Sequence, residues 1–224
     1  MTATSTKDHT SALATSSASE PRCLLIRHAE RPPLPPGAPG TDLGLTRSGI
    51  EASFAYGAKL GEALASVRTS PVRRCIETAT HIGHGSRAGA PLHHDHKLGD
   101  PGVYIEDPAV AWTNWLRLGH EGVLAHLATG GAPLPGFADP AQATRLLMED
   151  LLGRAATMTG VHLAITHDSL MIPLLAGVLR RPLAADERPN FLEPIVLGRS
   201  HGNLFVRYRG RIHTAGHLVN VGRA

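Results

Sequence analysis

Three short clusters of polar residues hold the side chains of this sequence that are best suited to chemistry. They are Arg27-His28, the run from Ser70 to Arg74, and His167-Asp168. Arginines bind phosphate through a planar fork of N–H donors, and a histidine beside them can attack phosphorus to form a phosphohistidine. A carboxylic acid can protonate the leaving oxygen. The clusters therefore contain the groups needed for phosphoryl transfer.

The positive charge for such a reaction can come from the arginines. The sequence has no glycine-rich phosphate loop of the Walker type and no set of residues with the spacing of a metal site. The run His93-His94-Asp95-His96 offers possible ligands, but successive residues of a strand point to opposite faces and cannot all meet at one ion. We interpret this run as an exposed polar stretch, and we expect neither a metal nor another cofactor.

Each polar cluster follows a segment with the pattern of a strand. The continuous apolar run at 23–26 is typical of a strand buried on both faces, 161–166 is predicted as another buried strand, and 65–69 as a further short strand. In open sheets with helices on both faces, ligands bind outside the carboxyl ends of the strands. Polar clusters at three predicted strand ends are therefore the main functional signal in the chain.

Helical patterns alternate with these strands. We expect an α/β fold, a three-layer α/β/α sandwich with a mostly parallel sheet. Ser70 is predicted as the N-cap of the second helix, with Pro71 as its first residue. The remaining predicted elements are helices that begin near Thr46 and at Ser169 and that span 112–127 and 141–158, a strand at 92–98, and a closing hairpin of 203–208 and 211–217.

Length and composition fit a single domain with a large core. The chain has 224 residues, of which 42% are hydrophobic and 18% charged, and its formal net charge is +3. Residues 1–21 are rich in Ser, Thr and Ala and are predicted to be a disordered tail. Residues 22–224 are predicted to form the domain, with an irregular excursion over the active site at about 99–138.

Several kinds of partner are not indicated. The chain has no dense Lys/Arg block, so we expect no nucleic-acid binding. No apolar run approaches the roughly 18 residues of a membrane span, and the N-terminus lacks the apolar core of a secretory signal. We therefore expect a cytoplasmic protein without a membrane partner. The sequence leaves the oligomeric state open.

The polar clusters also carry a family resemblance. The segment 27–33, Arg-His-Ala-Glu-Arg-Pro-Pro, resembles the R-H-G-x-R-x-P signature of the acid phosphatase branch of the histidine phosphatase superfamily, with Ala29 in place of glycine. The segment 70–79 resembles the second block of that superfamily, S-P-x-x-R-A-x-x-T-A. Thr166-His167-Asp168 resembles its late H-D block. The three blocks occur in the expected order over roughly residues 22–180.

The resemblance implies a phosphoglycerate mutase-like fold and a set of site residues. It implies that His28 is the nucleophile, that Asp168 is the proton donor, and that phosphate is bound by Arg27, Arg31, Arg74 and His167. The chain is closer in length to the mutase-like branch, where the donor is a glutamate after the second block. Glu106 and Asp100 are therefore alternative donors.

These residues predict a metal-independent phosphatase that hydrolyses a small-molecule phosphomonoester through a phosphohistidine on His28. Two alternatives remain open: a phosphomutase with the same intermediate, and a non-catalytic module that binds a phospholigand. The substrate is not identified by the sequence. Trp112 and Trp115 can either line a substrate cavity or pack the excursion.

Overall fold

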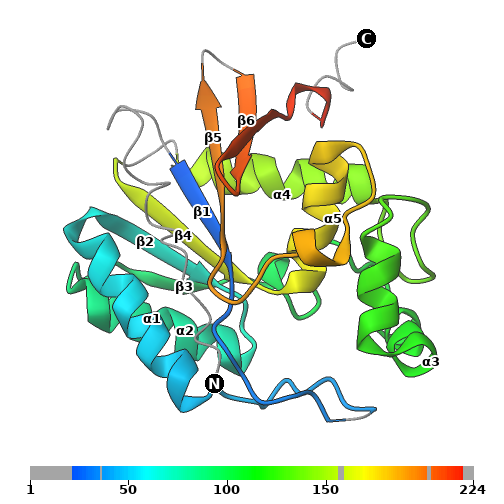
Figure 1. The fold of residues 1–224 in the computed structure, drawn as a ribbon, viewed down its shortest axis with the longest axis horizontal. Helices are drawn as coiled ribbons and strands as arrows, with labels where there is room; N and C mark the ends of the chain where they lie inside the picture. The colour runs from blue at the N-terminus through cyan, green and yellow to red at the C-terminus, as the bar shows by residue number, and fades with distance from the viewer. Residues whose placement is uncertain (1–21, 36, 156–158, 201–202, 219–224) are drawn as a thin grey trace.

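One mixed sheet forms the centre of the molecule, in the strand order β3-β2-β4-β1-β5-β6-β7 (Figure 1). The computed structural model describes residues 22–35, 37–155, 159–200 and 203–218, and the predicted tail at 1–21 lies outside them. The strands are β1 (Arg22–Arg27), β2 (Leu64–Thr69), β3 (Leu92–His94), β4 (Val161–Thr166), β5 (Pro194–Ser200), β6 (Asn203–Tyr208) and β7 (Arg211–Thr214).

The direction of the strands divides the sheet into two parts. Strands β3, β2, β4 and β1 run parallel, whereas β5 is antiparallel to β1 and continues into the antiparallel β6 and β7. The predicted mostly parallel sheet and the β6–β7 hairpin are confirmed. Strand β5 had not been predicted, because Pro194 and Gly198 interrupt its apolar pattern.

Helices cover both faces of the sheet (Figure 1). α1 and α2 pack with one set of buried strand residues, and α3, α4 and α5 pack with the other. The predicted three-layer sandwich is therefore confirmed. The helices are α1 (Arg47–Leu60), α2 (Arg73–Ser86), α3 (Pro108–Leu127), α4 (Pro140–Ala155) and α5 (Asp168–Leu179).

The middle of strand β1 is buried on both faces of the sheet. Cys23 and Leu25 belong to the core on the α3–α5 side, whereas Leu24 and Ile26 belong to the core on the α1–α2 side. All four are at most 1% exposed. Because both faces of the strand are buried here, all four positions from 23 to 26 are apolar, and no alternating pattern remains.

Several predicted element boundaries were wrong. Helix α3 begins at Pro108 rather than at 112, β7 ends at Thr214 rather than at 217, and residues 156–158 of the predicted helix 141–158 lie outside the described residues. Helix α2 begins at Arg73 with Val72 as its N-cap, so Ser70 lies before the helix and its hydroxyl is available for other contacts. The predicted strand at 92–98 ends at His94, and a short 3-10 helix (His96–Leu98) follows it. The predicted start of α1 is confirmed, since Thr46 caps it by accepting a hydrogen bond from the Gly49 N–H.

The polar run at 93–96 lies on the exposed edge strand and just beyond it. His93, His94 and His96 are exposed, as predicted, but Asp95 turns inward and forms an ion pair with Arg68 of β2. Within the described residues, no group of three or more His, Cys, Asp or Glu side chains is arranged to hold a metal ion.

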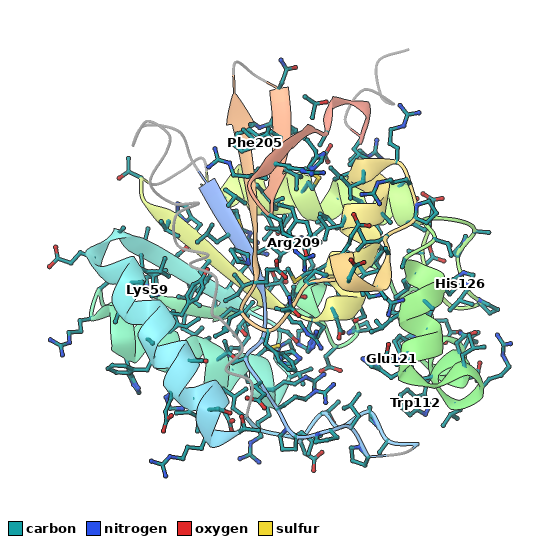
Figure 2. The ribbon with its side chains drawn as sticks, in the orientation of Figure 1. Lys59, Trp112, Glu121, His126, Phe205 and Arg209 are labelled. Atoms are coloured by element: carbon teal, nitrogen blue, oxygen red, sulfur yellow. The ribbon has the colours of Figure 1, made fainter. Side chains whose placement is uncertain are left out.

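The excursion consists mainly of α3 and the turns that flank it. Trp115 stacks on Phe137 with ring centroids 5.4 Å apart, and Trp112 stacks on Trp115 at 6.3 Å. Figure 2 shows Trp112 at the outer end of α3. These two tryptophans therefore pack the excursion. In the described ranges, no helix combines the length and the apolar character needed to cross a membrane.

Candidate active site

The register of three parallel strands brings the polar clusters together at the carboxyl ends of these strands. Arg27 of β1 lies opposite Thr166 of β4, and the His28 N–H donates to the Thr166 carbonyl at 2.9 Å. On the other side of β4, the Ser70 N–H donates to the Ile165 carbonyl at 3.0 Å. The first residues after β1, β2 and β4 therefore meet, as the sequence predicted.

His28 is held in one tautomer. Its side chain is buried, and Nδ1 lies 2.8 Å from the Ala29 carbonyl oxygen. Because a carbonyl oxygen can only accept, Nδ1 carries the hydrogen and Nε2 keeps its lone pair. The Nε of Arg74 donates to that Nε2 at 3.2 Å. The lone pair of His28 is therefore directed at the arginine side of the site.

His167 is also held in one tautomer, but its ring hydrogen is on Nε2 rather than on Nδ1. Its Nδ1 accepts from Nη2 of Arg74 at 3.2 Å, so the ring hydrogen lies on Nε2, which donates to the Ser70 hydroxyl at 3.0 Å. The His28 and His167 rings lie 5.4 Å apart. One guanidinium thus contacts both rings.

Both histidines are kept neutral. Burial is the largest cause that lowers the pKa of His28 well below its ordinary value, and His167 and Arg74 lower it further. Burial, followed by the charge of Arg74, lowers the pKa of His167 to about 3. A neutral imidazole with a free lone pair is the nucleophilic form of histidine.

Arg74, rather than its neighbour Arg73, belongs to this cluster. Arg74 is 9% exposed and makes a third hydrogen bond, to the Gly40 carbonyl at 2.8 Å. Arg73 lies on the outside, where it pairs with Glu77 at 2.7 Å. The structure thus brings together with His28 the arginine that the family resemblance selects.

Arg27 and Arg31 add positive charge and unused donors. In the described part of the chain, the Nε of each is buried without a hydrogen-bond partner. Arg27 also donates to the Pro189 carbonyl at 3.0 Å and lies 4.3 Å from the centre of the Phe191 ring. Unpartnered N–H groups beside a neutral histidine are suited to binding an anion.

Asp168 is the carboxylate of the cluster, and it is surrounded by donors. Oδ1 accepts from the Ser169 N–H at 2.8 Å, and Oδ2 lies 2.6 Å from Nη2 of Arg27 and 3.5 Å from Nε2 of His120. Burial raises the pKa of Asp168, but His120 and Arg27 together lower it by more. The carboxyl group therefore has a pKa below its ordinary range and is ionised.

The two alternative donors lie outside this network. Asp100 is exposed and follows Gly99, where a Cβ atom would lie only 2.7 Å from both the His167 ring and the Ser70 hydroxyl. Glu106 is exposed within the excursion, and its N–H donates to the Gly136 carbonyl. Asp100 is thus next to a residue that packs on the site, whereas the contacts of Glu106 are within the excursion.

The structure adds residues that the sequence reasoning did not select. The Thr78 hydroxyl accepts from the Ala29 N–H at 3.0 Å and donates to the Arg74 carbonyl at 2.7 Å, which joins the first two blocks. Its position in the second block was an available signal. Phe191, with its ring 5.5 Å from that of His28, lies in an irregular segment that gave no signal.

The segment that holds Phe191 is fixed by contacts with the antiparallel part of the sheet. Glu193, 3% exposed, accepts from Nε of Arg209 at 2.7 Å. Figure 2 labels Arg209, which follows β6. The Leu192 N–H also donates to the Arg27 carbonyl at 3.1 Å. This wall of the site therefore depends on the antiparallel strands.

The sequence of this chain was compared with protein families and with known proteins. Residues 23–102 match the family model described as histidine phosphatase superfamily (branch 1). No curated protein matches the chain.

Solved structures extend the comparison to most of the chain. A mycobacterial glucosyl-3-phosphoglycerate phosphatase is similar at 19% identity over 80% of this chain and 90% of that chain, with a TM-score of 0.55. A phosphoserine phosphatase from Entamoeba histolytica in complex with 3-phosphoglyceric acid is similar at 16% identity over 88% and 98%, with a TM-score of 0.58. At these identities the likeness shows the fold. The resemblance to the histidine phosphatase superfamily is therefore confirmed over residues 23–102, which the family model matches, and the predicted fold is confirmed by the solved structures over most of the chain.

Proposed function

We propose that the protein is a phosphatase that hydrolyses a small-molecule phosphomonoester through a phosphohistidine on His28. The observation that carries this proposal is the neutral His28 ring, whose Nε2 lone pair faces Arg74 at 3.2 Å. Arg27 and Arg31 supply further positive charge, and each has a buried N–H without a partner among the described residues. A module that only binds phosphate does not require a nucleophile in this state.

The proposed reaction has two steps. Nε2 of His28 forms a bond to phosphorus while the bond from phosphorus to the ester oxygen breaks, and a proton delivered by Asp168 leaves with that oxygen as an alcohol. Water then attacks the phosphohistidine and releases inorganic phosphate. The phosphoryl oxygens are bound by three arginines, which stabilise their charge in the transition state, and by His167, whose Nε2–H turns from the Ser70 hydroxyl to a phosphoryl oxygen. In this mechanism the arginines replace a metal ion, and the residues that bind phosphate are Arg27, Arg31, Arg74 and His167.

The class of substrate is supported by the names of similar structures. One is a glucosyl-3-phosphoglycerate phosphatase, and another is a phosphoserine phosphatase in complex with 3-phosphoglyceric acid. These proteins act on or bind small phosphate esters. We propose the same class for this chain, and we propose that residues 22–224 act as one domain with the excursion at about 99–138 beside the site.

The test is a phosphate-release screen combined with detection of the intermediate. The wild-type protein should release phosphate from at least one member of a panel of sugar phosphates, nucleotides and small metabolite phosphates. Quenched reactions should contain acid-labile, base-stable phosphate on His28. His28→Ala should remove both label and turnover, whereas His94→Ala, at an exposed position of β3, should change neither.

Other outcomes would select a different function. Transfer of phosphate to a second substrate hydroxyl without net release would indicate the phosphomutase. Binding of phosphate esters without label or turnover would indicate the non-catalytic module. Label on a different residue would contradict the assignment of the nucleophile.

A further inference from the structure

His120 is a titratable side chain at the site to which no role has been given so far. It follows Gly119, where the backbone of α3 leaves the helical conformation (φ 69°, ψ 173°). Its Nε2 lies 3.5 Å from Oδ2 of Asp168, and its side chain is 28% exposed. The imidazole of His120 thus extends from the excursion to the buried carboxylate of Asp168, and part of the ring remains exposed to water.

The surroundings of Asp168 make a proton source necessary. A proton donor must hold a proton before the reaction, yet both oxygens of Asp168 face donors. These contacts stabilise the ionised carboxylate, which has no proton to give. Charged or titratable groups that act on Asp168 are Arg27 and His28 at the end of β1, Arg31, Arg74 of α2, His167 and His120 of α3. Arginines do not deprotonate in proteins, and the ring hydrogen of His167 is bound to the Ser70 hydroxyl.

His120 is the member of this set that can carry an exchangeable proton to Asp168. The Arg27 guanidinium does not deprotonate in proteins, and the Nδ1 hydrogen of His28 is bound to the Ala29 carbonyl. The ring nitrogen of His120 can give a proton to the carboxylate that it faces, and its partial exposure leaves the ring in contact with water, from which it can recover a proton.

We propose that His120 supplies the proton that Asp168 delivers to the leaving oxygen, so that the two residues act as one donor pair. This inference rests on the proposed phosphatase function. His120 is a positioning residue that acts through Asp168, and the helix that carries it also contacts the segment before Phe191. Glu121, the next residue of α3, pairs at 3.3 Å with Arg188, which lies shortly before the segment that holds Phe191.

The proton and electron pairs balance over the cycle. A dianionic phosphate attracts Arg27 and repels the Asp168 carboxylate, which favours transfer of the His120 proton to Oδ2. As the ester bond breaks, its electron pair stays on the ester oxygen, and that oxygen takes the proton from Oδ2. His120 is then neutral and Asp168 ionised. In the second step, a proton of the attacking water returns through Asp168 to His120.

The experiment compares His120→Gln, Asp168→Asn and the double variant on two esters in the full chain. One is the alkyl phosphate hydrolysed fastest in the screen, whose alkoxide leaves poorly without a proton. The other is p-nitrophenyl phosphate, whose phenolate leaves well. General acid catalysis is worth about 10²–10⁴-fold, so each single variant should lower kcat for the alkyl ester by about 10²-fold or more and change the aryl ester far less.

The double variant tests whether the two residues form one pair. If His120 acts through Asp168, the double variant should be no slower on the alkyl ester than Asp168→Asn alone. His126→Gln is the matched control, because His126 lies on the same helix and contacts the Ala132 carbonyl (Figure 2). It should behave as wild type.

Three results would overturn the inference while leaving the phosphatase in place. These are an unchanged alkyl rate in His120→Gln, an equal loss on both esters, and losses that multiply in the double variant. Retained p-nitrophenyl phosphate turnover in His120→Gln shows that the variant is folded. A wild-type protein that hydrolyses no ester of the screen and gains no label on His28 would overturn the proposed function, and the inference with it.

Discussion

The Nε atom of Arg74 donates a hydrogen bond to Nε2 of His28 at 3.2 Å, while Nη2 of the same guanidinium contacts His167. A single arginine thus orders both imidazoles and lies at the lone pair proposed to attack phosphorus. When a phosphoryl group enters, its oxygens replace that lone pair as the acceptor for Arg74. These contacts therefore hold the donors where the phosphate oxygens are expected.

Arg74→Lys should strongly reduce activity because an ammonium cannot make three hydrogen bonds in the geometry of a planar fork. Loss of one donor to transition-state charge costs about 10²–10³-fold, and we expect a fall of that size in kcat/KM. Steady-state kinetics with p-nitrophenyl phosphate measure it. Arg73→Lys is the control, since Arg73 lies outside the cluster and pairs with Glu77. Equal losses in both variants would contradict the assignment of Arg74.

The proton donor can be identified by the dependence on the leaving group. Asp168→Asn should slow the alkyl ester by about 10²–10⁴-fold and p-nitrophenyl phosphate much less. Asp100→Asn and Glu106→Gln should leave the ratio of the two rates unchanged, because both side chains are exposed outside the Asp168 network. The measurement is kcat for both esters in each variant. A selective alkyl defect in Asp100→Asn or Glu106→Gln would transfer the donor role to that residue.

The stability of the protein should decrease as pH falls below about 6.5, the usual pKa of an unfolded histidine. The pKa values of folded His28 and His167 are lowered, so the unfolded chain takes up protons that the folded chain does not. Each histidine contributes a decrease of up to about 1.4 kcal/mol per pH unit until its folded pKa is reached. Urea unfolding at several pH values between 5 and 7 measures the slope, and His28→Gln should reduce it. An identical slope in that variant would show that His28 is not the source.

Activity should survive exhaustive treatment with EDTA. The proposed mechanism assigns the neutralisation of phosphate charge to Arg27, Arg31 and Arg74, whose charge does not depend on a bound ion. Phosphate release before and after chelation and dialysis provides the measurement. A loss that Mg²⁺ or Zn²⁺ restores would exclude this arginine-only mechanism.

Gly49→Ala should destabilise the fold and lower activity together. A Cβ atom on Gly49 would lie 2.3 Å from the Glu30 carbonyl oxygen, so α1 would have to move away from the loop that follows His28. Overpacking of this kind costs about 1–3 kcal/mol, which thermal or urea unfolding can measure. Gly83→Ala in α2 is the matched control. No atom lies within 4 Å of its added Cβ, and alanine should stabilise the helix by about 0.5–1 kcal/mol. Equal effects at the two positions would refute the steric explanation.

The sequence by itself determined the parts of this protein that depend on local pattern. Strands buried on both faces are largely apolar without alternation, and this pattern predicted the strands at 23–26 and 161–166. The order of strands and helices then placed three polar clusters at the carboxyl ends of parallel strands. That rule brought His28, Ser70 and His167 together without knowledge of any contact.

Only the tertiary structure decided how these groups are partnered. His120 approaches Asp168 across 48 positions of the chain through the kink at Gly119, and a conformation of one backbone residue leaves no periodic signal. Phe191 reaches His28 because Glu193 and Arg209 fix an irregular segment between α5 and β5. The sequence indicated that Asp168 was the acid, yet its ionisation depends on Arg27 and His120. Residue types and strand order are encoded locally, whereas the protonation of a buried group depends on every charge and dipole that packing places around it.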